Sequence, residues 1–161
     1  MRHRLDEIDL EILQTLQRRG RTKRSELADQ VGLTIPSVSE RLRKLEELGI
    51  IRGYAALLDP KKIGLEVMAF IVVELESSRY FDPFVQRALD NDEILECHAI
   101  TGEGSYLVKA RTKDTSTLER LLSEIRSWPG VANTRTSIVL SSPKDTTVLP
   151  LTQLELAVKR A

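Results

Sequence analysis

Cysteine and histidine, the side chains best suited to act as nucleophiles, general bases or metal ligands, are scarce in this chain. Cys97 directly precedes His98 in an apolar segment that predicts a β-strand. Successive side chains of a strand point to opposite faces, so we expect Cys97 to pack inward and His98 to face outward rather than to form a nucleophile–base pair. One cysteine and two histidines at these spacings make no metal site. We therefore expect no catalytic residue, no metal, no cofactor and no enzymatic activity.

Two glycines lie one residue apart in AITGEGSYLVKAR, residues 99–111, between two apolar segments. A dinucleotide-binding loop needs a third glycine three residues after the second, where this chain has Leu107. A Walker loop needs Gly-Lys followed by Ser or Thr, which these residues do not supply. A hairpin turn and a small-ligand loop both remain open, because exposed backbone N–H groups of glycines can bind a carboxylate such as that of an amino acid.

The residues expected to contact such a ligand lie in this turn and on a strand near the end of the chain. The turn offers backbone N–H groups, the Ser105 hydroxyl and the Glu103 carboxylate, while the Tyr106 ring is expected to pack inward beside Val108. The predicted set is Thr101, Gly102, Glu103, Gly104, Ser105, Tyr106, Thr134 and Thr136.

Cations gather near the start of the chain, where they could contact phosphates. The run RRGRTKR, residues 18–24, places five cations in seven residues. Such a run is usually a solvated surface, and only its neighbours favour nucleic-acid binding. Apolar residues around it recur every three or four positions and predict three short helices, which end near Gly20, Gly32 and Gly49.

The second and third helices carry the spacing of a helix-turn-helix. Ala28, Gly32 and Val38 stand at relative positions 5, 9 and 15 of the motif. A small residue lets the two helices approach, a glycine tolerates the positive φ of the turn, and an apolar residue anchors the third helix. In that helix Ile35, Val38, Leu42 and Leu45 share one arc and are expected to be buried. A three-helix bundle with no role in DNA binding is the alternative.

The helix-turn-helix predicts double-stranded DNA as a partner, with hydroxyl and cationic side chains on base edges and phosphates. The predicted DNA-binding residues are Arg21, Lys23, Arg24, Thr34, Pro36, Ser37, Ser39, Glu40, Arg41, Arg43 and Lys44.

The second half of the chain alternates strands and helices. Period-two segments at 65–75, 94–100, 106–112 and 131–140 predict strands, and 81–92 and 114–128 predict helices. This order, β-α-β-β-α-β, is the ferredoxin-like arrangement.

The predicted domains are a DNA-binding domain at 1–52, a connecting strand and linker at 53–64, a ferredoxin-like domain at 65–141 and a tail at 142–161, with a short helix at 152–159.

The first predicted strand of that domain is apolar on both faces. Met68, Phe70 and Val72 lie opposite the face formed by its other apolar residues. If both helices cover one face, the other exposes enough apolar surface to favour a second copy of the domain packed against it. The alternative is a face shielded by the tail.

The composition is ordinary for a globular protein, with 41% hydrophobic residues and no net charge. The longest apolar run, residues 67–73, is far shorter than the roughly 20 residues of a membrane span. A single cysteine excludes an internal disulfide and fits a reducing compartment. No secretory signal is recognised, so we expect a cytoplasmic protein without membrane contact.

The chain resembles the Lrp/AsnC, or feast/famine, family of transcriptional regulators. The resemblance rests on LDEIDLEILQTLQRRGR, ELADQVGLTIPSVSERLRKLEELGIIRGYAALLDP, ECHAITGEGSYLVKAR and WPGVANTRTSIVLSSPKDTTVLPL, which together run from near residue 5 to near residue 151. It implies an α+β fold with an N-terminal winged helix-turn-helix and a C-terminal ferredoxin-like (RAM) domain. It also implies homodimers that assemble into octamers or similar discs, and an amino-acid effector bound between dimers.

One departure concerns the effector. Family members often carry Gly-x-x-Asp-Tyr in the hairpin, whereas Ser105 replaces the acid here. The effector's ammonium group thereby loses its usual partner, with Glu103 as a substitute, and we expect a weak or altered response rather than a leucine response. Two alternatives stay open: an effector-free architectural DNA-binding protein, and an amino-acid-binding metabolic domain fused to a helical module.

Overall fold

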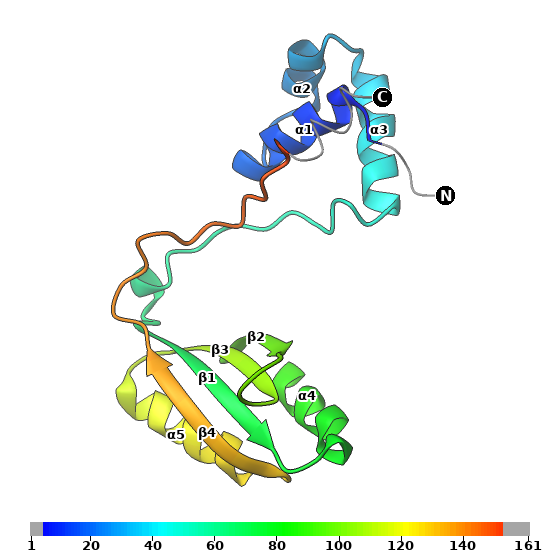
Figure 1. Ribbon diagram of the computed structural model, residues 1–161. Helices are drawn as coiled ribbons and strands as arrows, with labels where there is room; N and C mark the ends of the chain where they lie inside the picture. Colours follow the sequence, from blue (N-terminus) through cyan, green and yellow to red (C-terminus); the bar gives the residue numbers. More distant parts are fainter. Residues whose placement is uncertain (1–4, 153–161) are drawn as a thin grey trace. The chain divides into compact units, whose positions relative to one another are not determined.

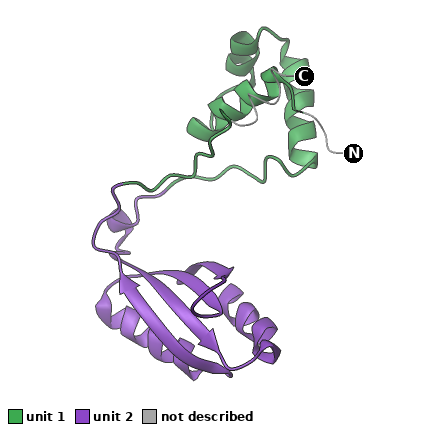
Figure 2. Cartoon of the chain, viewed as in Figure 1, with its two compact units in different colours: residues 1–57, 144–161 green, residues 58–143 purple. Residues whose placement is uncertain are grey.

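The structure is a computed structural model that describes residues 5–152 of the 161-residue chain. These residues form two compact units (Figure 2). Unit 1 contains residues 5–57 together with 144–152, and unit 2 spans Leu58–Pro143. The predicted division placed the boundary a few residues earlier, at 52, and left the tail on its own. The structure instead joins the described part of the tail to the first unit.

The described part of unit 1 contains the helices α1 (Glu7–Arg18), α2 (Arg24–Val31) and α3 (Ile35–Glu47) (Figure 1). Helix α1 begins at a capping box: the Asp6 carboxylate accepts from the Asp9 N–H at 2.8 Å, and the Asp9 carboxylate accepts from the Asp6 N–H at 3.2 Å. Thr34 caps α3, because its hydroxyl accepts from the Ser37 N–H.

The apolar core of unit 1 confirms most of the predicted helix faces. Val38, Leu42 and Leu45 of α3 are buried against α1 and α2. Ile35 was predicted to join them, but its side chain is 49% exposed. It occupies the first position of α3, where a side chain tilts back toward the helix N-terminus, past the last core contact.

The segment between the units contains no strand, contrary to the predicted connecting strand within residues 53–64. Residues 51–59 carry no regular structure, and the short 3₁₀ helix η1 (Lys61–Ile63) follows Pro60. An extended segment becomes a strand only where a neighbouring strand takes up its N–H and C=O groups, and no described strand of this chain lies beside it. The helix-turn-helix of unit 1 therefore has no paired β-wing among residues 5–57.

Unit 2 has the predicted ferredoxin-like order. Strand β1 (Val67–Leu75) leads through the 3₁₀ helix η2 (Ser78–Tyr80) to helix α4 (Phe81–Leu89), followed by the hairpin β2 (Ile94–Ala99) and β3 (Tyr106–Thr112). Helix α5 (Thr115–Ser127) and strand β4 (Val131–Ile138) complete the unit. The sheet order is β2-β3-β1-β4 and every pairing is antiparallel (Figure 1).

Element ends differ by a few residues from those predicted. Helix α4 ends at Leu89 rather than 92, because Asn91 turns the chain by accepting from the Glu93 N–H. It begins at Phe81, as predicted, and η2 leads directly into it. The helix predicted at 152–159 lies outside the described residues, apart from its first position.

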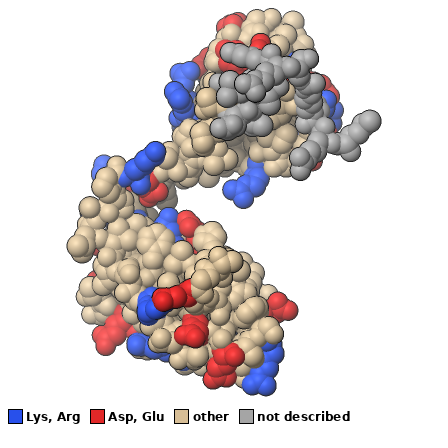
Figure 3. Space-filling model, viewed as in Figure 1, with Lys and Arg blue, Asp and Glu red and all other residues tan. Residues whose placement is uncertain are grey.

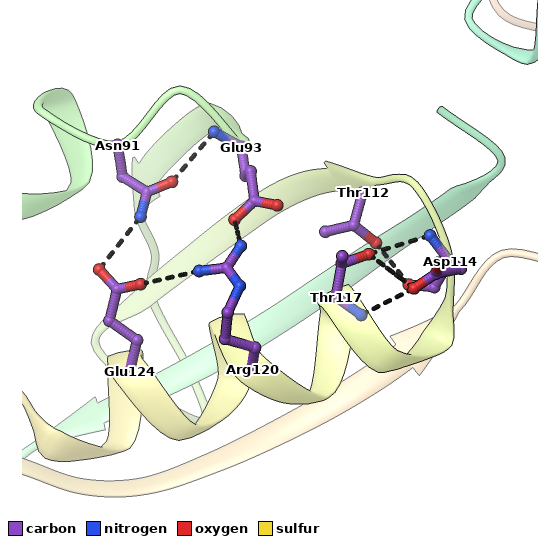
Figure 4. Close-up of polar contacts among 7 residues, drawn as sticks. All are labelled: Asn91, Glu93, Thr112, Asp114, Thr117, Arg120 and Glu124. Carbon is purple, nitrogen blue, oxygen red and sulfur yellow. Dashed lines mark hydrogen bonds and ion pairs between the residues drawn. The ribbon is translucent and has the colours of Figure 1, made fainter. Parts of the chain in front are cut away.

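Polar contacts hold α5 in place at two points (Figure 4). At its start, Asp114 and Thr117 form a reciprocal capping box, which keeps the pKa of Asp114 below its ordinary value. One turn further on, Arg120 pairs with Glu93 and with Glu124, and this raises the pKa of Arg120. The Arg120–Glu93 pair ties α5 to the turn that precedes β2.

The two faces of the sheet have different environments. Ile71 and Val73 of β1 are fully buried with Phe84 of α4 and Leu121 of α5, so both helices cover the same face. The opposite face, called the open face below, carries Met68, Phe70 and Val72 of β1, as predicted. Acidic and basic side chains are interspersed over the visible surface of unit 2 (Figure 3). None of the described helices combines the length and apolar character needed to cross a membrane.

Candidate DNA-binding and effector-binding sites

The turn between α2 and α3 confirms the predicted helix-turn-helix. Ala28 is buried where the two helices meet, and Val38 is fully buried under α3. Gly32 ends α2 with φ 68° and ψ 32°, a left-handed conformation that favours glycine. The three residues therefore perform the roles that their spacing predicted, and they fix which face of α3 turns outward.

The outward face of α3 carries most of the DNA-binding side chains that were predicted within this helix. Positions 36, 37, 40, 43, 44 and 47 lie opposite the buried arc at 100° per residue, and all six are exposed. At the start of the helix the Thr34 and Ser37 hydroxyls lie 2.8 Å apart. The N-terminal part of a recognition helix is the part that contacts base edges.

Arg43 lies on this face and is held by two acids of the same helix. Its guanidinium pairs with Glu40 one turn before it and with Glu47 one turn after it. These contacts raise the pKa of Arg43 and lower that of Glu40. Binding to a phosphate or a guanine requires Arg43 to exchange a carboxylate partner for DNA.

Arg41 was predicted to contact DNA, but the structure directs it toward α1. Its Nη1 atom donates to the carboxylates of Asp6 and Asp9, each at 2.7 Å. The Asp9 side chain is only 5% exposed, so this is the most buried ion pair of unit 1 among those described. Burial raises the pKa of Asp6, but bonds from the Asp9 N–H and Arg41 outweigh it and leave that pKa below its ordinary value.

The basic run before α2 lies partly beside α3. Arg21, Lys23 and Arg24 are exposed, and Arg24 donates to the Ser39 hydroxyl at 3.4 Å, across the two helices. Tyr54 was not predicted as part of this site, but its hydroxyl donates to Glu46 of α3 at 2.9 Å. Burial and this bond raise the pKa of Tyr54 to about 12. A tyrosine after a helix gives no periodic signal, so only the structure reveals the contact.

The predicted turn at residues 101–105 closes the β2–β3 hairpin. Ala99 pairs with Tyr106, and the Ile100 N–H donates to the Ser105 carbonyl. Gly104 has φ 93°, and a Cβ atom built there would lie 2.4 Å from Cγ1 of Val72. Gly102 has φ 96° with open space around it. Gly104 is thus required by both backbone conformation and packing, whereas Gly102 is required by conformation alone.

Ser105 anchors this turn to β1. Its N–H donates to the Val73 carbonyl at 2.8 Å, and its hydroxyl accepts from the Leu75 N–H at 3.1 Å. The second bond falls where the β1–β4 register shifts, between Glu74 and Leu75. The hydroxyl therefore satisfies a backbone group that the irregular pairing leaves available.

The turn carries one ion pair that the sequence reasoning did not find. Glu103 pairs with Arg135 of β4 at 2.7 Å, and both side chains are exposed. Arg135 lies opposite Val72 in the β1–β4 register and so belongs to the open face. The face of the sheet on which Arg135 lies cannot be predicted from the sequence without the β1–β4 register.

Two of the predicted effector-binding threonines lie on the other face of the sheet. Thr134 pairs with Val73 and Thr136 with Ile71, both of which point toward the helices. The structure thus does not bring these hydroxyls to the Glu103 side chain. The Tyr106 ring is buried against Phe81 and Phe84, as its predicted inward packing requires, so only its backbone borders the turn.

The adjacent cysteine and histidine point apart, as predicted. Cys97 packs against the core, and burial raises the pKa of its thiol. His98 is exposed and pairs with Glu96 on the open face. Among residues 5–152 no cluster of three or more His, Cys, Asp or Glu side chains could hold a metal ion.

A helix-turn-helix with an outward polar helix, joined to an α+β unit with a glycine turn, defines a DNA-binding regulator with a ligand-binding domain. Comparison with known families agrees. Residues 5–52 match the winged helix-turn-helix DNA-binding family, and residues 68–149 match the Lrp/AsnC ligand-binding domain.

Relatives and solved structures match nearly the whole chain. The HTH-type transcriptional regulator FL11 of Pyrococcus horikoshii is 38% identical over 151 residues, which cover 94% of this chain and 99% of that protein. The leucine-responsive regulatory protein of Escherichia coli K12 is 38% identical over 143 residues, 87% of each chain.

The transcriptional regulator NMB0573 of Neisseria meningitidis, solved in complex with L-Met, superposes with a TM-score of 0.89 at 38% identity, over 93% of this chain and 99% of that one. The chain therefore belongs to the Lrp/AsnC family of transcriptional regulators, and the predicted family and fold class are confirmed.

Proposed function

We propose that this protein is a cytoplasmic, sequence-specific transcriptional regulator without a catalytic role, in which α3 enters the major groove of DNA. The observation that carries the proposal is the outward face of α3, whose six exposed positions include Ser37, Arg43 and Lys44. Ser37 and Arg43 offer base-edge contacts, while Lys44 and the basic residues before α2 supply phosphate contacts. Arg41 is paired with Asp6 and Asp9, so its role in this proposal is to hold α3 on α1.

The working form is a homodimer that assembles further into an octamer or a similar ring. Support comes from the open face of unit 2, where Phe70, Val72 and Leu107 are only half-buried. A second copy packed sheet to sheet would remove this apolar surface from water. Such a dimer would present two α3 helices to half-sites about 34 Å apart, or a multiple of that distance, on one side of the DNA.

The effector is a small amino-acid-type ligand held at the 101–105 turn. A zwitterion carries the same two charges as the Glu103–Arg135 pair, so its carboxylate can replace Glu103 at Arg135 while Glu103 binds its ammonium group. The backbone N–H groups around Gly102 add carboxylate contacts. Because the ligand must displace an existing ion pair, and because Ser105 supplies no acid, binding is expected to be weak.

Calorimetric titration of the twenty amino acids tests the effector site, with DNA binding measured for each ligand that binds. Arg135→Gln should abolish carboxylate binding, and Thr134→Val, on the helix-covered face, is the matched control. If Arg135→Gln binds the ligand as the wild type does, the site lies elsewhere. If no amino acid binds the wild type while operator binding persists, the effector-free architectural regulator is the correct description.

A further inference from the structure

The C-terminal segment, residues 144–152, is called the strap below. Strand β4 ends at Ile138 in unit 2, and the chain then returns to unit 1 at Lys144. The strap carries no regular structure before Thr152, and Figure 1 shows it, in orange to red, reaching α1. The polypeptide therefore connects the two units twice, once before β1 and once after β4.

The strap binds α1 through the Gln17 side chain, whose amide bonds both main-chain groups of one strap residue. The Gln17 amide accepts from the Leu149 N–H at 2.6 Å and donates to the Leu149 carbonyl at 3.2 Å. Leu151, two residues further on, packs against the apolar core of unit 1 and is half-buried. Gln14 and Arg18 line the same groove on α1. The N–H and the C=O of Leu149 are thus both hydrogen-bonded, and Leu151 adds an apolar contact, so the strap is specifically bound to unit 1.

The other end of α1 holds the recognition helix. Gln17 lies in the last turn of α1, whereas Asp9 in its first turn, with the capping residue Asp6, pairs with Arg41 of α3. The twelve residues of α1 span about 18 Å. Helix α1 thus contacts the strap at one end and α3 at the other. A contact at one end can therefore affect the position of the element bound at the other end.

We infer that the strap is a working part of the DNA-binding unit: by holding α1 it keeps α3 in the orientation that binds DNA. Because residues 139–143 join the strap to β4, which carries Arg135, the strap also links the strand of the effector turn's ion pair covalently to unit 1. The inference rests on DNA binding by α3 as proposed above.

The test is operator affinity of full-length variants, measured by fluorescence anisotropy well below the melting temperature. Gln17→Ala removes both bonds to Leu149, and Leu151→Asp removes the apolar anchor. Each should weaken operator binding about two- to tenfold, the upper value corresponding to about 1.4 kcal/mol. Gln86→Ala, which removes a glutamine contact on α4 of unit 2, is the matched control and should bind as the wild type does.

Two truncations separate the strap from the residues after it. Removal of residues 153–161 should leave affinity unchanged, whereas removal of 144–161 should reproduce or exceed the loss in Gln17→Ala. If the longer truncation does not fold, the point variants decide. Lower melting temperatures with unchanged operator affinity would overturn the inference, because the strap would then only stabilise the unit. Absence of operator binding by the wild type would instead refute the proposed function.

Discussion

Replacement of Asp9 with asparagine should weaken DNA binding, although it removes a negative charge from a protein that binds a polyanion. The Asp9 carboxylate accepts from Arg41 at 2.7 Å and is nearly buried, so the bond orients α3 on α1. Hydrogen bonds to charged groups contribute about 1.5–3 kcal/mol, roughly twice the neutral value. Asparagine keeps the shape and one acceptor, so the loss should be about 1–1.5 kcal/mol.

That loss corresponds to roughly a five- to tenfold weaker operator affinity if it falls entirely on the DNA-competent orientation of α3. Asp29→Asn, an exposed charge removal on α2, is the control and should leave binding unchanged or slightly tighter. The assay is anisotropy titration at two salt concentrations, beside a melting curve. If Asp9→Asn binds DNA as tightly as the control, the Asp9–Arg41 bond does not keep α3 in its DNA-binding orientation.

Four further outcomes follow from the structure. Gly104→Ala should destabilise unit 2 by about 2 kcal/mol, from strain and from the clash with Val72, and Gly102→Ala by about 1 kcal/mol from strain alone; equal thermal denaturation would contradict this. The lowered pKa of Asp6 means that its stabilising contribution is present above about pH 3.9 and is lost as the pH falls through the pKa of the folded state. Asp6→Asn should therefore make the melting temperature depend less on pH in the acid range. Val72→Glu on the open face should yield monomers by light scattering, and a wild-type monomer at micromolar concentration would exclude the sheet-to-sheet dimer. The raised pKa of Cys97 should make its alkylation at neutral pH much slower than that of an unfolded chain.

Local spacing made the helix-turn-helix predictable from the sequence. Ala28, Gly32 and Val38 all lie within α2, α3 and the turn between them, so their roles do not depend on contacts distant in sequence. The order of strands and helices in unit 2 was equally accessible, because period two and period 3.6 differ clearly there. Ile35 was misplaced because periodicity alone ignores where a helix begins.

The effector turn and the strap depended on contacts distant in sequence. Thr134 was predicted to contact the ligand and Arg135 was not, because only the β1–β4 register assigns each residue to a face. Arg41 looked like a DNA contact because a cation on a recognition helix gives the same signal whether it faces phosphates or Asp9. Nothing in the residues around Leu149 predicts its bonds to Gln17, 132 positions away.

The most direct test of α3 as the DNA-reading element begins with an operator selected from random duplexes. Affinity for that operator and for a scrambled duplex is then compared between the wild type and Arg43→Ala. If Arg43 leaves Glu40 and Glu47 to bind a base, operator affinity should fall roughly 5- to 150-fold, and affinity for the scrambled duplex should fall much less. Equal losses on both duplexes with a smaller salt slope would make Arg43 a phosphate contact. Unchanged operator affinity in a protein that also carries Ser37→Ala and Lys44→Ala would contradict the account.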